Sequence, residues 1–171
     1  VWPRWRVILL RVCRLGSSAY CKKRGQYRPM RHLLPKESWA LMQADPTALM
    51  IDIRMEIEAM YVGSPPGAVN IPWYEYPDFT ADVAAFCAAV AAEAGDKNRP
   101  ILLLCRSGQR SVVAGEALEG DGADDAGQAL EAAGFTDVIN VLHGFEGDLN
   151  DNFHRSTVNG WRFDGLPWQQ M

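Results

Sequence analysis

Short hydrophobic runs alternate with polar, turn-forming stretches along most of the chain. Four apolar runs have the length of β-strands, and they span residues 48–53, 68–71, 101–104 and 138–142. The run Ile101–Leu104 contains only large aliphatic residues, which is typical of a strand buried on both faces of a parallel sheet. Pro72 follows the second run and the loop 63–67 precedes it, so we expect a short strand there.

Segments with helical periodicity lie between these runs. In residues 81–94 the bulky side chains recur at helical spacing among alanines, at Val83, Phe86, Cys87 and Val90, and Gly95 ends the segment. A second helix is expected to start near Gln109, with an apolar stripe at Val113, Ala114, Ala117 and Leu118. Alternating strands and helices at this spacing predict right-handed crossovers. The predicted fold class is therefore α/β, a parallel sheet flanked by helices on both faces.

The charge of the chain is unevenly distributed. The 171 residues are 48% hydrophobic and carry a net charge of -4, which fits about one domain with a sizeable core. Ten of the 17 basic residues lie between Arg4 and Lys36, so the remainder carries 7 basic and 21 acidic residues. An acidic body argues against nucleic acid as a partner. The apolar runs are too short to cross a bilayer, so we expect a soluble, cytoplasmic protein with no membrane partner.

Residues 1–30 differ from the rest of the chain. They are rich in Arg, contain no acidic residue, and have one apolar cluster, Val7–Leu10, that Arg11 interrupts too early for a secretory signal. We expect residues 1–30 to be an extension that is disordered or foreign to the native protein, and residues 31–171 to form the domain. Two alternatives remain open for the extension: an organelle-targeting peptide and a basic arm that touches an anionic surface.

Neither the cysteines nor the aspartates predict a metal site. The four cysteines include no Cys-x-x-Cys pair, and they are Cys13, Cys21, Cys87 and Cys105. The triplet Ala-Leu-Glu occurs at 117–119 and again at 129–131, and the acidic spacer between the copies does not follow the calcium-loop pattern. We therefore expect no bound metal, and an acidic surface insertion near residues 120–131.

A polar loop follows the apolar run at 101–104, and it reads Cys105-Arg106-Ser107-Gly108-Gln109-Arg110-Ser111. In a parallel sheet the carboxyl ends of the strands are the usual place for binding sites, and a turn into a helix directs several backbone N–H groups at one point. These donors, the helix dipole, Arg106 and Arg110 all favour the nucleophilic thiolate form of Cys105. The loop therefore predicts a reactive cysteine in a site for an anion.

Three segments resemble the rhodanese family of sulfurtransferases. The loop that begins at Cys105 resembles the family's active-site loop, which starts with a cysteine after the fourth core strand. Asp52-Ile53-Arg54 resembles the family's Asp-x-Arg, and residues 67–72 resemble its Pro-Gly-Ala-x-Asn-Ile-Pro signature. The resemblance covers about residues 33–142 and extends to 160–167, and it implies a rhodanese-like sheet. We expect Asp52 and Arg54 to brace the site as a structural ion pair rather than to take part in catalysis.

The resemblance implies a two-step sulfur relay. The Cys105 thiolate would take the outer sulfur of a small anionic donor such as thiosulfate, and cyanide, a thiol or a protein cysteine would then accept it. The donor would be bound by the loop from Arg106 through Ser107, Gly108 and Gln109 to Arg110, with backbone amides supplying most of the contacts. The resemblance implies no metal and no organic cofactor.

The sequence departs from the family pattern in two places and leaves two other functions open. Ser64 stands where the family often has His, and His143-Gly144 where it often has Gly-Gly, so the substrate preference stays open. The protein could be a persulfide carrier or an interaction module without turnover. A cysteine-dependent phosphatase would need Cys-x5-Arg, whereas Ser111 takes the place of that arginine and the ring is shorter.

Overall fold

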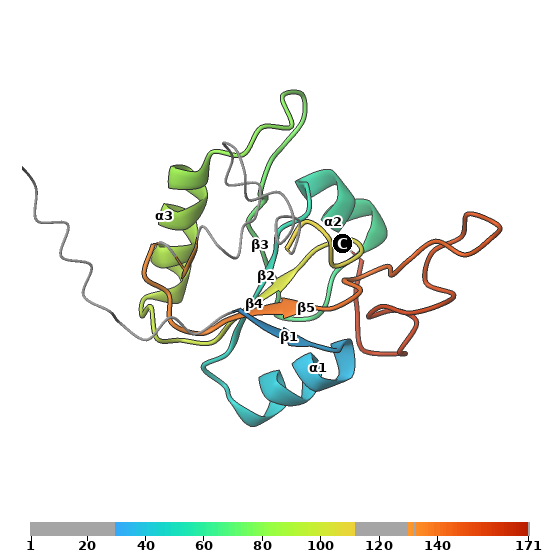
Figure 1. The fold of residues 1–171 in the computed structure, drawn as a ribbon, viewed down its shortest axis with the longest axis horizontal. Coiled ribbons are helices and arrows are strands. Elements are labelled where there is room, and N and C mark those ends of the chain that lie inside the picture. The colour runs from blue at the N-terminus through green and yellow to red at the C-terminus, as the bar shows by residue number, and fades with distance from the viewer. Residues whose placement is uncertain (1–29, 112–129, 132, 171) are drawn as a thin grey trace, which may run out of the picture.

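The structure is a computed structural model that describes residues 30–111, 130–131 and 133–170. Its centre is a five-stranded sheet (Figure 1). The strands are β1 (Arg31–Leu33), β2 (Leu49–Asp52), β3 (Val69–Asn70), β4 (Ile101–Leu104) and β5 (Val138–Val141). They lie in the order β1-β5-β4-β2-β3, and every neighbouring pair is parallel.

Burial on both faces explains why the central strands are apolar throughout. All residues of β2, β4 and β5 are buried. Along β4, Ile101 and Leu103 belong to the core cluster on one face of the sheet, and Leu102 and Leu104 belong to the cluster on the other. The four predicted apolar runs correspond to β2, β3, β4 and β5, with ends that differ by at most one residue.

Helices cover both faces of the sheet (Figure 1). The helix α3 (Val83–Ala94) contributes Phe86 and Val90 to the core cluster that contains Ile101. The helix α1 (Pro35–Ala44) packs Trp39 against the opposite cluster. The predicted α/β class, with a parallel sheet between helices, is therefore confirmed.

The helix predicted at 81–94 is present from Val83 to Ala94. It begins later than predicted because the Asp82 side chain caps it, with its Oδ1 accepting a hydrogen bond from the Ala85 N–H at 2.9 Å. Gly95 ends it at a φ of +70°, a left-handed conformation that glycine adopts without strain.

Three elements were not predicted: β1, α1 and α2 (Glu56–Val62). The strand β1 has three residues at the edge of the sheet and two of them are basic or His, so no apolar run marks it. In α2 only Ala59 is buried, whereas Ile57 and Tyr61 are 56% and 71% exposed. A helix without an apolar stripe leaves no periodic signal in the sequence.

Several predictions concern residues that the structure does not describe. The extension at 1–29, with Cys13 and Cys21, and most of the helix expected after Gln109 lie outside the described residues. Residues 109–111 themselves form a bend and a turn. Leu130 is fully buried in the core, so the acidic insertion expected near 120–131 cannot extend to this residue.

The chain after β5 folds back over the sheet and ends beside α2. Trp161 is fully buried, and its Nε1–H donates to the Pro167 carbonyl at 2.8 Å. Ser64 and Gln169 exchange two backbone hydrogen bonds of 2.9 Å. Among the described residues no helix is long and apolar enough to span a membrane.

Candidate active site

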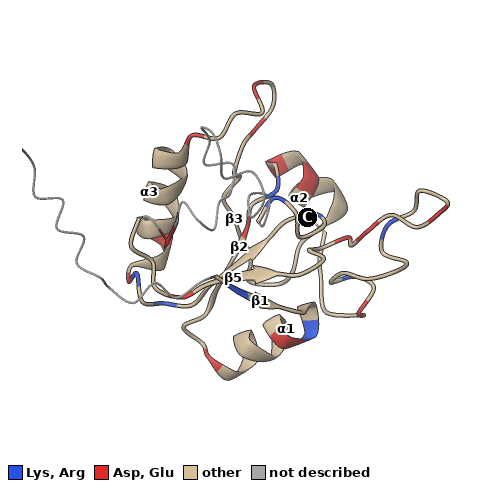
Figure 2. Ribbon diagram, in the orientation of Figure 1, with Lys and Arg blue, Asp and Glu red and all other residues tan. Residues whose placement is uncertain are grey.

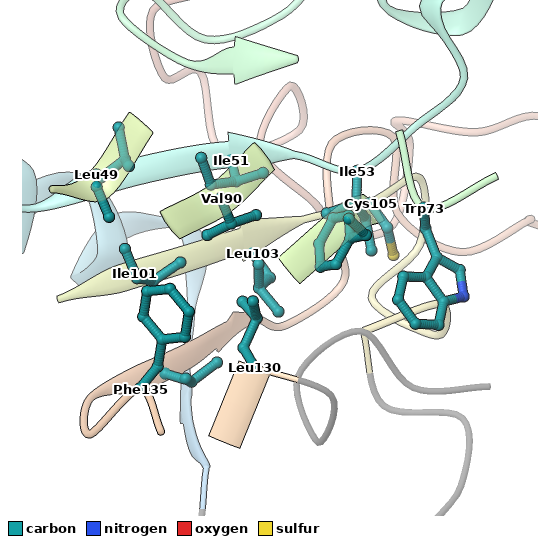
Figure 3. Packing of buried hydrophobic residues seen from close by; sticks show 13 residues of the cluster. Leu49, Ile51, Ile53, Trp73, Val90, Ile101, Leu103, Cys105, Leu130 and Phe135 are labelled. Carbon is teal, nitrogen blue, oxygen red and sulfur yellow. The ribbon is translucent and has the colours of Figure 1, made fainter. Parts of the chain in front are cut away.

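The cysteine loop, residues 105–111, starts directly after β4, at the carboxyl edge of the sheet. Cys105 has no exposed surface and belongs to the core cluster with Trp73, and Figure 3 shows both at one end of that cluster. The Gly108 N–H donates to the Cys105 Sγ at 3.1 Å, and the Ser111 Oγ lies 3.5 Å from the same sulfur. The sulfur is thus enclosed by its own loop and receives a backbone donor.

Two glycines hold the cysteine loop against the segment after β5. Gly108 has a φ of +81°, and a Cβ at this position would lie 2.6 Å from the His143 N. Gly144 has a φ of +56°, and its Cβ would lie 2.3 Å from the Cys105 carbonyl oxygen. Two backbone hydrogen bonds of 2.8 Å join the segments, from Phe145 N to Cys105 O and from Glu146 N to Arg106 O. The approach of two backbones fixes the curve of the loop, and no side chain fits between them.

A buried chain of polar side chains runs from Cys105 to the edge of the sheet. The Ser111 hydroxyl donates to the Asn140 Oδ1 at 2.5 Å, and the Asn140 Nδ2 lies 3.2 Å from the His32 Nδ1. Ser111 and Asn140 are fully buried. Buried polar groups are costly unless they are hydrogen-bonded, so this chain holds the Ser111 hydroxyl beside the sulfur.

Sequence reasoning missed Ser111, Asn140 and His32 as residues of the site. The one available signal was Asn140, a polar residue in the otherwise apolar run 138–142. Its partners come from β1 and from the cysteine loop, which lie 108 and 29 residues away along the chain. Only the sheet order, which places β5 between β1 and β4, brings them together.

Arg110 forms a bidentate ion pair with Glu58 of α2. Its Nη1 and Nη2 donate to the two carboxylate oxygens at 2.6 and 2.9 Å, and its guanidinium lies 5.3 Å from the Tyr74 ring centroid. Partial burial opposes ionisation of both groups, but the mutual hydrogen bonds and charge attraction outweigh it. They lower the pKa of Glu58 and raise that of Arg110. Figure 2 shows the acidic residues of α2 on the side of the sheet's carboxyl edge.

Arg106 is also paired with a carboxylate. Its Nε donates to the Glu146 Oε2 at 2.9 Å, while the rest of the side chain is about half exposed. Ser107 is half-buried and Gln109 is exposed, and neither side chain makes a hydrogen bond within the described part of the chain. Both arginines of the loop are therefore matched by glutamates that the sequence pattern did not reveal.

Asp52 and Arg54 lie beneath the loop and are fully buried. They form a bidentate ion pair. Its shortest contact is 2.5 Å, from the Arg54 Nη2 to the Asp52 Oδ2. Arg54 also donates to the Gly63 carbonyl at 2.7 Å and stacks 4.4 Å from the Phe145 ring centroid. The Asn70 side chain donates to the backbone carbonyls of Asp52 and Arg54 at 2.9 and 2.8 Å. The pair ties the ends of β2 and β3 to the segment after β5.

The arrangement suits nucleophilic chemistry at a single sulfur atom. The cysteine sits where a parallel sheet presents its strand ends, with a backbone donor and a hydroxyl beside it. No group of His, Cys, Asp or Glu that could hold a metal ion occurs among the described residues. Around its thiol the site supplies a backbone N–H, a hydroxyl group and two arginines that are paired with glutamates.

Comparison with known proteins assigns the family. The Rhodanese-like domain family matches residues 34–151. The crystal structure of Rv0390 from M. tuberculosis is 31% identical, with a TM-score of 0.61, and the match covers 82% of this chain and 97% of that one. The chain therefore belongs to the Rhodanese-like domain family, and the resemblance found in its sequence is confirmed.

More distant structures share the fold. The Rhodanese-like domain of the Alr3790 protein from Anabaena sp. is 16% identical with a TM-score of 0.53, and the match covers 85% of this chain and 81% of that one. A thiosulfate sulfurtransferase from Pseudomonas aeruginosa is 19% identical with a TM-score of 0.51, and the match covers 82% of this chain and 20% of that one. A search of curated protein sequences finds no significant match. At 16% and 19% identity, these two structures show a shared fold.

Proposed function

We propose that this protein is a sulfurtransferase that carries a sulfane sulfur as a Cys105 persulfide. The observation that supports this most directly is the position of the Cys105 Sγ, which is enclosed by its loop and accepts the Gly108 N–H at 3.1 Å. A sulfur anion needs hydrogen-bond donors that are already oriented, and backbone amides in a tight loop meet that need. The same donor serves the thiolate before transfer and the persulfide after it.

In the first step the Cys105 thiolate attacks the outer sulfur of thiosulfate or a similar donor. An S–S bond forms between Cys105 and that sulfur, the S–S bond of thiosulfate breaks, and sulfite leaves with the electron pair of the broken bond. The thiol proton has already gone to solvent. Because Cys105 is fully buried, the new S–S bond of about 2.05 Å places the transferable sulfur further toward the mouth of the loop.

In the second step a thiophilic acceptor, cyanide or a thiolate, attacks that outer sulfur. The bond to Cys105 breaks, its electron pair returns to Cys105 as a thiolate, and the product is thiocyanate or an acceptor persulfide. The two half-reactions share one enzyme intermediate, which is ping-pong chemistry. No oxidant or reductant other than donor and acceptor is needed.

Mass spectrometry of the thiosulfate-treated protein tests this proposal. We expect one added sulfur atom on the Cys105 peptide, removed by cyanide with release of thiocyanate, and no adduct in the Cys105→Ser variant. Cys87→Ser is the matched control, because burial raises the pKa of the Cys87 thiol against a smaller opposing effect of Lys97, which makes it a weak nucleophile. Wild-type protein without an adduct, or an active Cys105→Ser variant, would contradict the proposal.

A persulfide carrier that serves one partner is the second candidate, and the paired arginines favour it. Glu58 and Glu146 offset the charges of Arg110 and Arg106, so little uncompensated positive charge attracts a doubly charged anion to the loop. A carrier loaded by a protein persulfide needs no such attraction. Single-turnover loading rates separate the candidates: a carrier loads from a cysteine persulfide far faster than from thiosulfate, and a thiosulfate enzyme does the opposite.

The geometry gives no support to a phosphatase. Such sites have an arginine at the seventh position of the loop, counting the cysteine as the first. In this chain Ser111 occupies that position, and it is fully buried and hydrogen-bonded to Asn140. A hydroxyl cannot neutralise a phosphoryl group as a guanidinium does. An aryl phosphate assay run beside the thiosulfate assay checks this, and phosphate release without thiocyanate would reverse the assignment.

A further inference from the structure

A basic hollow opens beside the cysteine loop, walled by the segment that follows β5. Its volume is about 510 Å³, and its lining residues are Arg106, Glu146, Leu149, Phe153, His154, Arg155, Ser156, Thr157 and Arg162. Volumes of this size are typical of sites for small ligands. The lining contains three arginines against a single carboxylate, although residues outside the N-terminal extension are strongly acidic overall.

Each arginine of the hollow is held in place by one contact that leaves part of its guanidinium available. Arg155 donates its Nη1–H to the Gly147 carbonyl at 2.5 Å, and Arg162 lies 4.5 Å over the Trp168 ring. Arg106 uses its Nε on Glu146 at 2.9 Å. A guanidinium has five N–H donors in a fixed fork, so these contacts orient the groups without using all their donors.

The hollow also exposes apolar surface that the fold does not bury. Phe153 is 82% exposed and has a φ of +59°, a backbone conformation that side chains other than glycine rarely adopt. Leu149 on the same lining is 48% exposed. An exposed aromatic residue in an unfavourable conformation, beside several guanidinium groups, fits a ligand with both carboxylates and apolar atoms.

The backbone connects this hollow to the nucleophile. Arg106 directly follows Cys105, and its carbonyl accepts a hydrogen bond of 2.8 Å from the Glu146 N–H. Arg106 and Glu146 both line the hollow, so the lining begins one residue after the cysteine that carries the reacting sulfur. A ligand in the hollow therefore lies beside the loop that holds the persulfide.

We propose that this hollow binds the sulfur acceptor and that the acceptor is a small, acidic peptide thiol. The inference rests on the proposed sulfurtransferase function and adds the chemical class of its second substrate. Arg155 and Arg162 would bind the carboxylates of the peptide through charge-assisted hydrogen bonds. The exposed Phe153 would contact its apolar atoms, and the thiol would reach the Cys105 persulfide past Arg106.

Acceptor selectivity tests this inference. With thiosulfate as donor, kcat/KM is measured for glutathione, which is anionic, and for 2-mercaptoethanol, which is neutral, and the ratio of the two is compared between variants. In the double variant Arg155→Gln, Arg162→Gln we expect this ratio to fall about tenfold, the effect of about one charge-assisted hydrogen bond. Arg31→Gln, which removes an exposed arginine at the opposite edge of the sheet, is the control and leaves the ratio unchanged.

Charge reversal and direct binding complete the test. Arg155→Glu with Arg162→Glu should shift selectivity toward cysteamine, a cationic thiol, and equal ratios in all variants would overturn the inference. S-methylglutathione cannot accept sulfur, so its binding by calorimetry tests the hollow even if the protein forms no persulfide. Binding to the wild type that weakens at least fivefold in the Gln double variant supports the site, and no binding to the wild type refutes it.

Discussion

The two sides of the cysteine loop hold their polar groups in different ways. On the inner side, Asp52, Arg54, Ser111 and Asn140 have no exposed surface and are hydrogen-bonded to one another or to backbone groups. On the outer side, the Arg106–Glu146 and Arg110–Glu58 pairs remain partly in water. Buried pairs are costly to break because a lone charge is left without solvent, whereas partly exposed pairs contribute little. The buried groups of the inner side therefore stabilise the conformation of the loop. The partly exposed ion pairs of the outer side set its net charge.

Breaking the inner ion pair should have the largest effect on the molecule. Arg54→Met keeps a long side chain against Phe145 but leaves the Asp52 carboxylate buried and unpaired, so we expect a loss of about 3–5 kcal/mol in the free energy of unfolding. Urea denaturation measures it. The double variant Asp52→Asn, Arg54→Met should regain part of the loss, because no buried charge is then left alone. A double variant less stable than Arg54→Met would show that the charge is not the cause.

Removing the inner hydroxyl should slow the chemistry with a smaller effect on stability. Ser111→Ala removes the hydroxyl that lies 3.5 Å from the Cys105 Sγ and leaves the Asn140 Oδ1 without its partner. The single hydroxyl hydrogen points to Asn140 in the structure, and it has to turn toward the sulfur to stabilise the Cys105 thiolate. We expect iodoacetamide to alkylate Cys105 about fivefold more slowly, corresponding to about 1 kcal/mol for one hydrogen bond. Thr136→Ala, which removes an exposed hydroxyl far from the loop, is the control. Equal alkylation rates in Ser111→Ala and the wild type would remove Ser111 from the site.

Releasing the outer arginine should change affinity for the donor more than it changes stability. Glu58→Gln leaves Arg110 without its carboxylate and makes the loop more positive, so we expect the KM for thiosulfate to fall about two- to threefold, an effect of about 0.5 kcal/mol. Glu56→Gln on the same helix is the matched control, because its side chain does not pair with the loop. A higher KM in Glu58→Gln would mean that the pair positions Arg110 for donor binding.

The smallest expected effect is the pH dependence of the stability that the Glu58–Arg110 ion pair contributes. Because the folded-state pKa of Glu58 lies below its ordinary value of 4.5, the pair's contribution to stability is present above about pH 4.5 and is lost as the pH falls through the lower, folded value. The difference in unfolding free energy between wild type and Glu58→Gln should be about 0.2–0.5 kcal/mol at pH 7 and vanish in acid. A difference that grows on acidification would contradict this sign.

Local patterns predicted the elements whose burial is strong and regular. The runs that became β2, β4 and β5 are buried on both faces, and the segment of α3 carries a clear apolar stripe ended by Gly95. The helix α2 buries one residue and β1 has three residues at an edge, so neither leaves such a pattern. Burial of few side chains is the common reason for these misses.

The sequence by itself predicted Cys105 as the candidate nucleophile and a tight polar loop around it. Cys105 directly follows the apolar run 101–104, and Gly108 supplies a left-handed backbone conformation within the loop, so neighbouring residues were sufficient for this prediction. Only the tertiary structure decided which groups surround the sulfur and balance its arginines. Asn140, Glu58 and Glu146 reach the loop from other elements, because the parallel sheet gathers the ends of distant strands at one edge. Contacts between residues far apart in the chain depend on the order of strands, and no local pattern records that order.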